Sequence, residues 1–311
     1  MTFRPLAVAC LLVLAGTASA CGLGPGEERR GGGAELRVTR GFGTELLKAD
    51  RVPKIREDQT VMRLLRAGND VETRYGGRFV QAIGGIEGRG ADGFADWFYY
   101  VNGLEADVGA AEYELSPGDV VQWDYRNWRN TMDIRAIVGA FPEPFKSGLG
   151  GKRFPTRVEC EDADSRACRT VKRVLREQGI PATGASLGAS GNQNVIRVVV
   201  ARWRRARELP SARRIEQGPR ASGVFARFTG GGSSLELLDE RGHVVRRAPD
   251  SFGLVAALRP SDTELVWLVT GVESAGVEHA ARALDRSSLR DAFAVAAGAG
   301  EREKLPLRGT R

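Results

Sequence analysis

The chain has 311 residues, with 46 Lys or Arg against 39 Asp or Glu, so its net charge is +7. Hydrophobic residues make up 42% of the sequence, which excludes a wholly disordered chain and is enough for two cores. The basic residues are scattered along the sequence rather than gathered into one stripe. On an exported chain such a surface faces anionic lipid or wall polymer, so we expect no nucleic-acid partner.

The N-terminal residues 1–20 predict a signal peptide. Arg4 supplies a positive charge, and the apolar run at 6–16 is too short to span a bilayer as a helix. Small residues directly before Cys21 resemble a bacterial lipobox, in which the cysteine is acylated and becomes the mature N-terminus. We expect lipid anchoring through Cys21 at the extracytoplasmic face of the cell membrane; the alternative is secretion with Cys21 as a bystander. Residues 21–34 are polar and rich in glycine, which predicts a flexible tether.

The segment 35–140 predicts a small α+β domain. Residues 34–43 alternate like a strand, and residues 59–68 have the apolar spacing of a short helix. Asn102-Gly103 is a strong hairpin signal. One helix among several strands favours a sheet with the helix packed across one face. The other expected strands are residues 79–88, 97–103, 113–128 and 132–139.

Three motifs occur in order along this domain. A Thr-Val-x-x-Leu-Leu pattern begins at Thr60, a Trp-x-Tyr-x-x-Asn-Gly pattern at Trp97 and a Gly-Asp-x-x-x-Trp-x-Tyr pattern at Gly118. Together they resemble the transcobalamin-like C-terminal domain, over about a third of the chain. The resemblance implies a β-grasp-like fold. In vitamin-carrier proteins this domain closes over cobalamin beside a helical barrel that has no counterpart in this sequence, so cobalamin is one candidate ligand among others.

Four consecutive aromatic residues occupy positions 97–100, in a chain that is 7% aromatic. Alternate side chains of a strand face opposite sides, so Trp97 and Tyr99 share one face and Tyr100 lies on the other. One face must pack under the helix, while the other is either open to a ligand or buried as well. The expected ligand-binding residues are Trp97, Tyr99, Tyr100, Asn102, Trp123 and Tyr125, with turn formation as the alternative role of Asn102.

The second half of the chain predicts a separate unit. Residues 141–151 are rich in Pro and Gly and predict a linker. Residues 152–298 alternate strands and helices, which predicts an α/β sandwich with a last helix at 289–298. Residues 299–311 predict a disordered tail. The expected fold class is therefore α+β, with a small β-grasp-like N-terminal domain before an α/β domain.

Besides Cys21, the expected mature chain holds two cysteines, Cys160 and Cys168. Exported proteins meet an oxidising compartment, where two remaining thiols usually form a disulfide. A zinc site would need four soft or imidazole ligands, and the chain offers only two histidines besides. We expect a disulfide between Cys160 and Cys168 and no metal site.

Catalytic motifs are not found in the sequence. It contains no Gly-x-Ser-x-Gly, no His-Glu-x-x-His and no Walker loop. Catalysis by two carboxylates stays open as an alternative, because their separation in space cannot be read from sequence. We expect neither an enzyme nor a cofactor.

These observations predict a membrane-anchored binding lipoprotein that captures a small ligand for uptake, with a corrinoid among the candidates. Its expected partners are the lipid bilayer through acylated Cys21, the small ligand and a membrane transporter. The alternative is a cell-surface or wall adhesion protein whose grasp domain binds a polymer or another protein.

Overall fold

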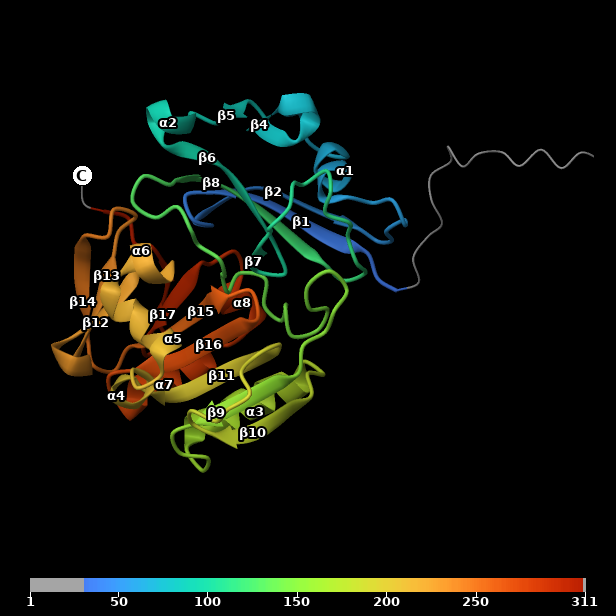
Figure 1. Cartoon of the computed structure of the whole chain (residues 1–311). Helices are drawn as coiled ribbons and strands as arrows, with labels where there is room; N and C mark the ends of the chain where they lie inside the picture. Colours follow the sequence, from blue (N-terminus) through green and yellow to red (C-terminus); the bar gives the residue numbers. More distant parts are fainter. Residues whose placement is uncertain (1–30, 310–311) are drawn as a thin grey trace, which may run out of the picture.

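The computed structural model describes residues 31–309, so Cys21 and the predicted signal peptide lie outside the described residues. Figure 1 shows a smaller unit, in blue and green, packed against a larger one in yellow to red. Both units combine sheets with few helices, which confirms the α+β class. Within residues 31–309, every helix is too short or too polar to cross a bilayer.

The first unit is built on a five-stranded sheet with the order β2-β1-β8-β6-β7. Its two central strands, β1 and β8, are parallel, and the other neighbours are antiparallel. The strands are β1 (Ala34–Arg40), β2 (Glu45–Val52), β6 (Ala95–Val101), β7 (Leu104–Glu105) and β8 (Val120–Asn127).

One face of this sheet is covered by helix α1 (Val61–Arg66). Thr60 caps the helix, because its hydroxyl accepts a hydrogen bond from the backbone N–H of Arg63 at 3.2 Å. Val61, Leu64 and Leu65 are buried against the sheet. A small antiparallel sheet and a short helix lie at the outer end of the unit (Figure 1): β3 (Val71–Arg74), β4 (Phe79–Ile83), β5 (Ile86–Glu87) and α2 (Gly90–Gly93).

The second unit is built on a seven-stranded sheet with the order β10-β9-β11-β16-β15-β17-β18. The four strands from β10 to β16 are parallel neighbours, and the remaining pairs are antiparallel. The strands are β9 (Thr156–Cys160), β10 (Ala182–Ser186), β11 (Val195–Arg202), β15 (Gly253–Ser261), β16 (Glu264–Gly271), β17 (Ala294–Ala297) and β18 (Arg302–Leu305).

Both faces of this sheet are buried. Strand β11 shows why: Ile196 and Val198 point into one core and Val199 into the other, as its continuous apolar run requires. Helices α3 (Arg166–Glu177), α7 (Ser274–Arg282) and α8 (Arg286–Leu289) contribute side chains to the first core. The second core lies under β12 (Ala226–Thr229), β13 (Ser234–Leu238), β14 (Val244–Ala248) and the short helices α4 (Trp203–Ala206), α5 (Pro210–Arg213) and α6 (Pro219–Ser222).

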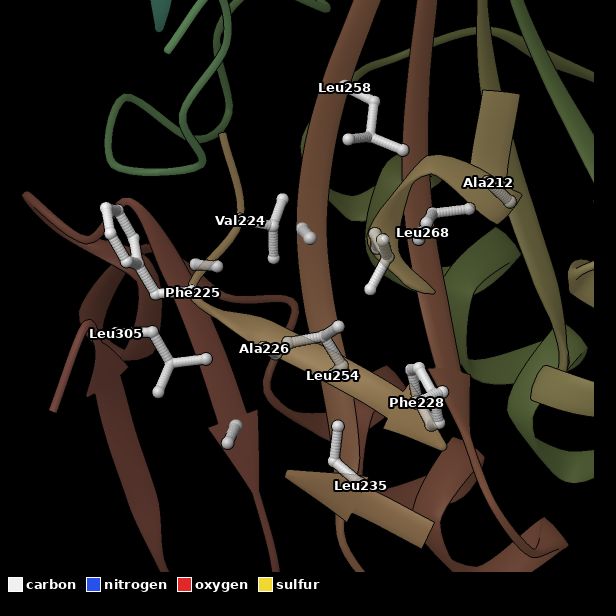
Figure 2. Close-up of a cluster of buried hydrophobic side chains, with 14 of the residues drawn as sticks. Ala212, Val224, Phe225, Ala226, Phe228, Leu235, Leu254, Leu258, Leu268 and Leu305 are labelled. Atoms are coloured by element: carbon white, nitrogen blue, oxygen red, sulfur yellow. The ribbon is translucent and has the colours of Figure 1, made fainter. Parts of the chain in front are cut away.

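Figure 2 shows this second core from within. Phe228 of β12 and Leu235 of β13 extend toward Leu254 and Leu268 of the large sheet, and Leu305 closes the side formed by the last strands. The close packing explains why these positions are apolar.

Three expectations for the second half of the chain are wrong. Residues 141–151 are not an open linker, because Phe141 and Phe145 are buried with ring centroids 6.0 and 4.9 Å from that of Trp267. The expected helix at 289–298 is replaced by strand β17, whose alanines are buried between β15 and β18. The tail expected at 299–311 is ordered through strand β18, since its backbone pairs with β17 and Leu305 is fully buried.

Candidate functional site

The first unit contains a ladder of four aromatic side chains on the face turned toward α1. Trp97 and Tyr125 are direct partners across β6 and β8, as are Tyr99 and Trp123. Their ring centroids lie 5.3 and 4.9 Å apart, and the second pair is stacked at an interplanar angle of 26°. These four predicted ligand-binding residues therefore come together on one face; they are called the aromatic ladder below.

The protein shields most of the aromatic ladder from solvent. Trp97 and Trp123 are 5% and 3% exposed, and only Tyr99 and Tyr125 are half-buried. Trp97 donates its indole N–H to the carbonyl of Ile86 at 2.9 Å, and the Tyr125 hydroxyl donates to a neighbouring carbonyl at 3.1 Å. Burial raises the pKa of Tyr99, which keeps its hydroxyl protonated. Only the rims of the two tyrosine rings can meet solvent.

The opposite face of β6 is buried by the second unit. Tyr100 is fully buried, with its ring 5.6 Å from that of Phe293, and the guanidinium of Arg126 lies 3.7 Å from the ring centre of Phe98. The hydroxyl of Tyr100 has no hydrogen-bond partner among residues 31–309. The aromatic stretch is therefore a strand covered on both faces, and Tyr100 is closed to a ligand in this conformation.

Asn102 holds the turn after β6 together. Its φ of 55° is the left-handed conformation that the Asn-Gly turn requires. Its side-chain amide donates to Asp119 Oδ1 at 2.8 Å and to the Gly148 carbonyl at 2.6 Å, while its oxygen accepts from the Val120 N–H at 2.9 Å. Asn102 is fully buried, and both the nitrogen and the oxygen of its side chain are engaged in these contacts. Its role in the structure is therefore to form the turn.

A second group of aromatic residues, which the sequence analysis missed, lies on the outer surface. Tyr75 is 81% exposed and Phe79 39%, and their rings form an edge-on pair with centroids 6.4 Å apart. Val108 is 47% exposed, and a Cβ placed on the next residue, Gly109, would lie 3.7 Å from the carbonyl oxygen of Arg78. The two segments are thus neighbours, and Tyr75, Phe79 and Val108 are called the outer aromatic patch.

The patch is connected to the ladder and sits on a tight turn. The Tyr99 hydroxyl donates to the Val108 carbonyl, so the rim of the ladder borders the patch. Tyr75 has a φ of 54° and is followed by Gly76 and Gly77, also at positive φ. In the sequence, the two glycines directly after Tyr75 indicate a tight turn, and a turn is the signal that could have placed this ring at the surface.

Buried charges join the two units. Arg37 of β1 donates through both Nε and Nη2 to the carboxylate of Asp291, the second bond at 2.6 Å. Asp124 accepts from the Thr39 hydroxyl at 2.7 Å and from the backbone N–H groups of Phe42 and Gly43, each at 2.9 Å. Burial raises the pKa of Asp124 to about 6. The pair of Arg37 and Asp291 therefore joins the two units, whereas Asp124 is satisfied within the first unit, and these groups are engaged in structural contacts.

The second unit has a hollow of about 110 Å³ at the carboxyl ends of its parallel strands, the place where open α/β sheets usually bind ligands. Arg202 and Glu161 line it, and they pair through three side-chain contacts of 3.2, 3.2 and 2.5 Å. That pairing lowers the pKa of Glu161 against the effect of its burial. A paired carboxylate of low pKa is a poor general base, and the part of the chain described here contains no cluster of three metal-ligating side chains.

Cys160, at the end of β9, and Cys168, in the first turns of α3, form the expected disulfide. The disulfide fixes the start of α3 to the large sheet, where Cys168 is fully buried. The lipidation expected at Cys21 concerns a residue outside those described.

The comparisons with known proteins give one family match and two distant structural likenesses. Residues 58–127, from the turn before α1 to the end of β8, match the family model described as Domain of unknown function (DUF4430). A presumed metal-binding protein of Ruminococcus gnavus ATCC 29149 shares 14% identity at a TM-score of 0.25, over 31% of this chain and 97% of that one. Haptocorrin in complex with Cbi shares 14% identity at a TM-score of 0.24, over 30% of this chain and 25% of haptocorrin.

At these TM-scores neither solved structure bears on the ligand. A search of curated proteins finds no match to the chain. The family match is confined to the unit that carries the aromatic ladder and the outer aromatic patch, so similarity to known proteins is concentrated where the candidate site lies.

Proposed function

We propose that this protein is an extracytoplasmic binding lipoprotein, held to the membrane through acylated Cys21, that captures a small ligand on the outer aromatic patch. The observation that carries the proposal is the exposed ring pair of Tyr75 and Phe79. An apolar ring left in water beside a second ring costs free energy that a ligand would recover by covering both, stacked on one ring and in contact with the edge of the other. The ligand is therefore a molecule with a flat or apolar face, such as a corrinoid or a sugar ring.

The rim of the aromatic ladder extends this surface. Tyr99 and Tyr125 are half-buried, and Tyr99 borders Val108 of the patch. A ligand seated on the patch would reach these two phenol edges first. Because the protein is anchored to the membrane, it delivers the bound ligand to a transporter in that membrane. No residue of this surface needs a catalytic role.

Adhesion to a polymer is the second candidate function. It is favoured by the position of Tyr75 on a turn between β3 and β4, at the outer end of the molecule (Figure 1), where a long chain could lie across it. The hollows of about 110 and 460 Å³ lie in other parts of the molecule.

The ligand test uses the mature chain with Cys21→Ser, screened by thermal shift against corrinoids and wall glycans. A ligand that binds only the folded state raises the melting temperature. Tyr75→Ala and Phe79→Ala should abolish the shift while the melting temperature without ligand stays unchanged. Met132→Ala is the matched control, since Met132 is 58% exposed elsewhere. Retention of the shift in both aromatic variants would refute the patch as the site.

Membrane attachment is tested separately in cells. If Cys21 is acylated, Cys21→Ser should move the protein out of the membrane fraction or leave its precursor uncleaved. Unchanged processing together with unchanged retention in the membrane would argue against acylation.

A further inference from the structure

Helix α3 presents a row of cations on its outer side. Its apolar residues Ala167, Val171 and Leu175 are buried in the core of the second unit, and the disulfide at Cys168 fixes this orientation. The opposite side of the helix carries only charged residues and one threonine. The exposed cations are Arg166, Arg169, Lys172, Arg173 and Arg176, called the basic face below.

The basic face is only partly neutralised by the protein. Arg173 pairs with Glu177 at 2.9 Å, and Arg166 pairs with Glu278 of α7 at 3.3 Å. Lys172 and Arg176 make no ion pair or side-chain hydrogen bond within residues 31–309. Like charges one helical turn apart repel each other, so the helix carries them at a cost that a bound anion would remove.

There is room for anionic groups between these side chains. All five cations, together with Thr170, line one open hollow of about 420 Å³ along the helix. Guanidinium groups are well suited to phosphate because they can donate two parallel hydrogen bonds to it. The exposed side of α3 has no apolar side chain to insert among acyl chains, so contact would be made at the level of headgroups.

We propose that the basic face of α3 docks the second unit onto the anionic phospholipid headgroups of the membrane in which the protein is anchored. The proposal rests on the proposed attachment at Cys21. Residues 21–34 could span at most roughly 50 Å when fully extended, and a glycine-rich chain of that length spans roughly 20 Å on average. The second unit is therefore kept close to the bilayer at high effective concentration.

Electrostatics then favours one orientation of the molecule. Each Lys or Arg close to an anionic surface strengthens binding about fivefold, and the attraction fades within a Debye length of roughly 10 Å. An anchored chain that rests on α3 has its second unit against the lipid. In Figure 1 the small sheet with β4 and β5 lies at the end of the molecule away from α3. Phe79 begins β4 and Tyr75 lies in the turn before it, so docking through α3 leaves the end with these residues away from the lipid.

The test uses the mature chain with Cys21→Ser, so that binding is measured without the lipid anchor and does not depend on acylation. Co-sedimentation with vesicles of phosphatidylcholine and phosphatidylglycerol at 3:1 should show binding that is at least tenfold stronger than to phosphatidylcholine alone. Raising the salt from 50 to 300 mM should remove most of it. Lys172→Glu with Arg176→Glu should weaken vesicle binding at least tenfold at 50 mM salt.

The matched control is Arg241→Glu with Arg308→Glu, which changes the net charge equally at two exposed arginines beside another hollow. The control should change vesicle binding less than twofold, and both double variants should keep the melting temperature of the parent. Equal loss in the two double variants would overturn the proposal, as would equal binding to both kinds of vesicle. Stronger binding to soluble poly(glycerol phosphate) than to vesicles would assign the basic face to a wall polymer instead.

Discussion

The two large sheets of this protein are buried by different chemistry. The face of the first sheet that meets the second unit carries Arg37, Thr39, Gln122, Asp124 and Arg126, all nearly inaccessible to solvent. The central strands of the second sheet are buried mainly through apolar side chains, with the ion pair of Arg197 and Glu159 as an exception. Each buried polar atom needs a partner at a fixed place, whereas an aliphatic core needs mainly volume. The first sheet therefore determines how the units dock, and the second supplies most of the apolar burial.

The largest effect should come from the apolar core of the second unit. Trp267 is fully buried, and its ring lies 4.9 Å from that of Phe145. Trp267→Ala should lower the free energy of unfolding by about 3–5 kcal/mol, because it leaves a large cavity. Urea denaturation measures this loss. Trp267→Phe is the control and should cost much less, because the indole N–H has no partner within the described residues; equal losses would show that ring volume is not what matters.

Breaking the buried ion pair should cost somewhat less. Arg37→Ala leaves Asp291 buried without its main partner, and the expected loss is about 3 kcal/mol in the free energy of unfolding. Replacing both residues, as Arg37→Met with Asp291→Asn, should recover more than half of that loss, since no charge remains buried alone and Asn tolerates the φ of 65° at this position. A double variant that is no more stable than Arg37→Ala would mean that the two side chains contribute to stability in ways other than neutralising each other's charge.

The pH dependence of stability sharpens the comparison further. Burial raises the pKa of Glu105 to about 7 from 4.5, although Arg126 at 3.8 Å favours its ionised form. The folded state then keeps a proton that the unfolded state has lost, so the free energy of unfolding falls as the pH rises from about 4.5 to 7. We expect a decline of about 1–2 kcal/mol attributable to Glu105.

Asp124 contributes in the same direction, but its raised pKa of about 6 confines most of its effect to lower pH. Between pH 6 and 7 the decline should therefore disappear in Glu105→Gln. It should persist in Glu240→Gln, which changes an exposed carboxylate. Denaturation midpoints measured across this window decide the matter, and an unchanged slope in Glu105→Gln would contradict the prediction.

The smallest expected difference separates two tyrosines on opposite faces of β6. The Tyr99 hydroxyl donates to Val108, whereas the Tyr100 hydroxyl is buried without a partner among residues 31–309. Tyr99→Phe should lose about 1 kcal/mol of unfolding free energy, and Tyr100→Phe should lose nothing or gain slightly. Thermal denaturation compares the two, and a larger loss for Tyr100→Phe would mean that its hydroxyl is satisfied by water.

Local signals in the sequence predicted the local structure of the first unit. Helix α1 lies within the expected residues 59–68, Asn102 adopts the turn conformation, and the period-two alternation gave the correct pairs of faces in β6. The disulfide followed from the number of cysteines and the expected compartment. Each of these depends on residues close together in sequence or on composition.

Long-range contacts could not be predicted in the same way. The cover over Tyr100 comes from Phe293, far along the chain, so the pattern of β6 alone could not decide between an open and a buried face. The alanine-rich segment of β17 favours a helix by propensity, and only pairing with β15 and β18 makes it a strand. The exposed Tyr75 carries no periodic signal because it lies in a turn.

The contact between the first strand and the segment at α8 has a consequence for the order of assembly. Glu35 and Arg37 of β1 pair with Arg286 and Asp291, which are synthesised after more than 240 intervening residues. During synthesis the first sheet emerges early, with its polar side still in water, and its binding surface on the α1 side can form then. Docking must wait for the far end of the chain, because such distant contacts close late. The first unit is thus expected to fold before the protein is complete, whereas its orientation is fixed only when the segment at α8 has been made.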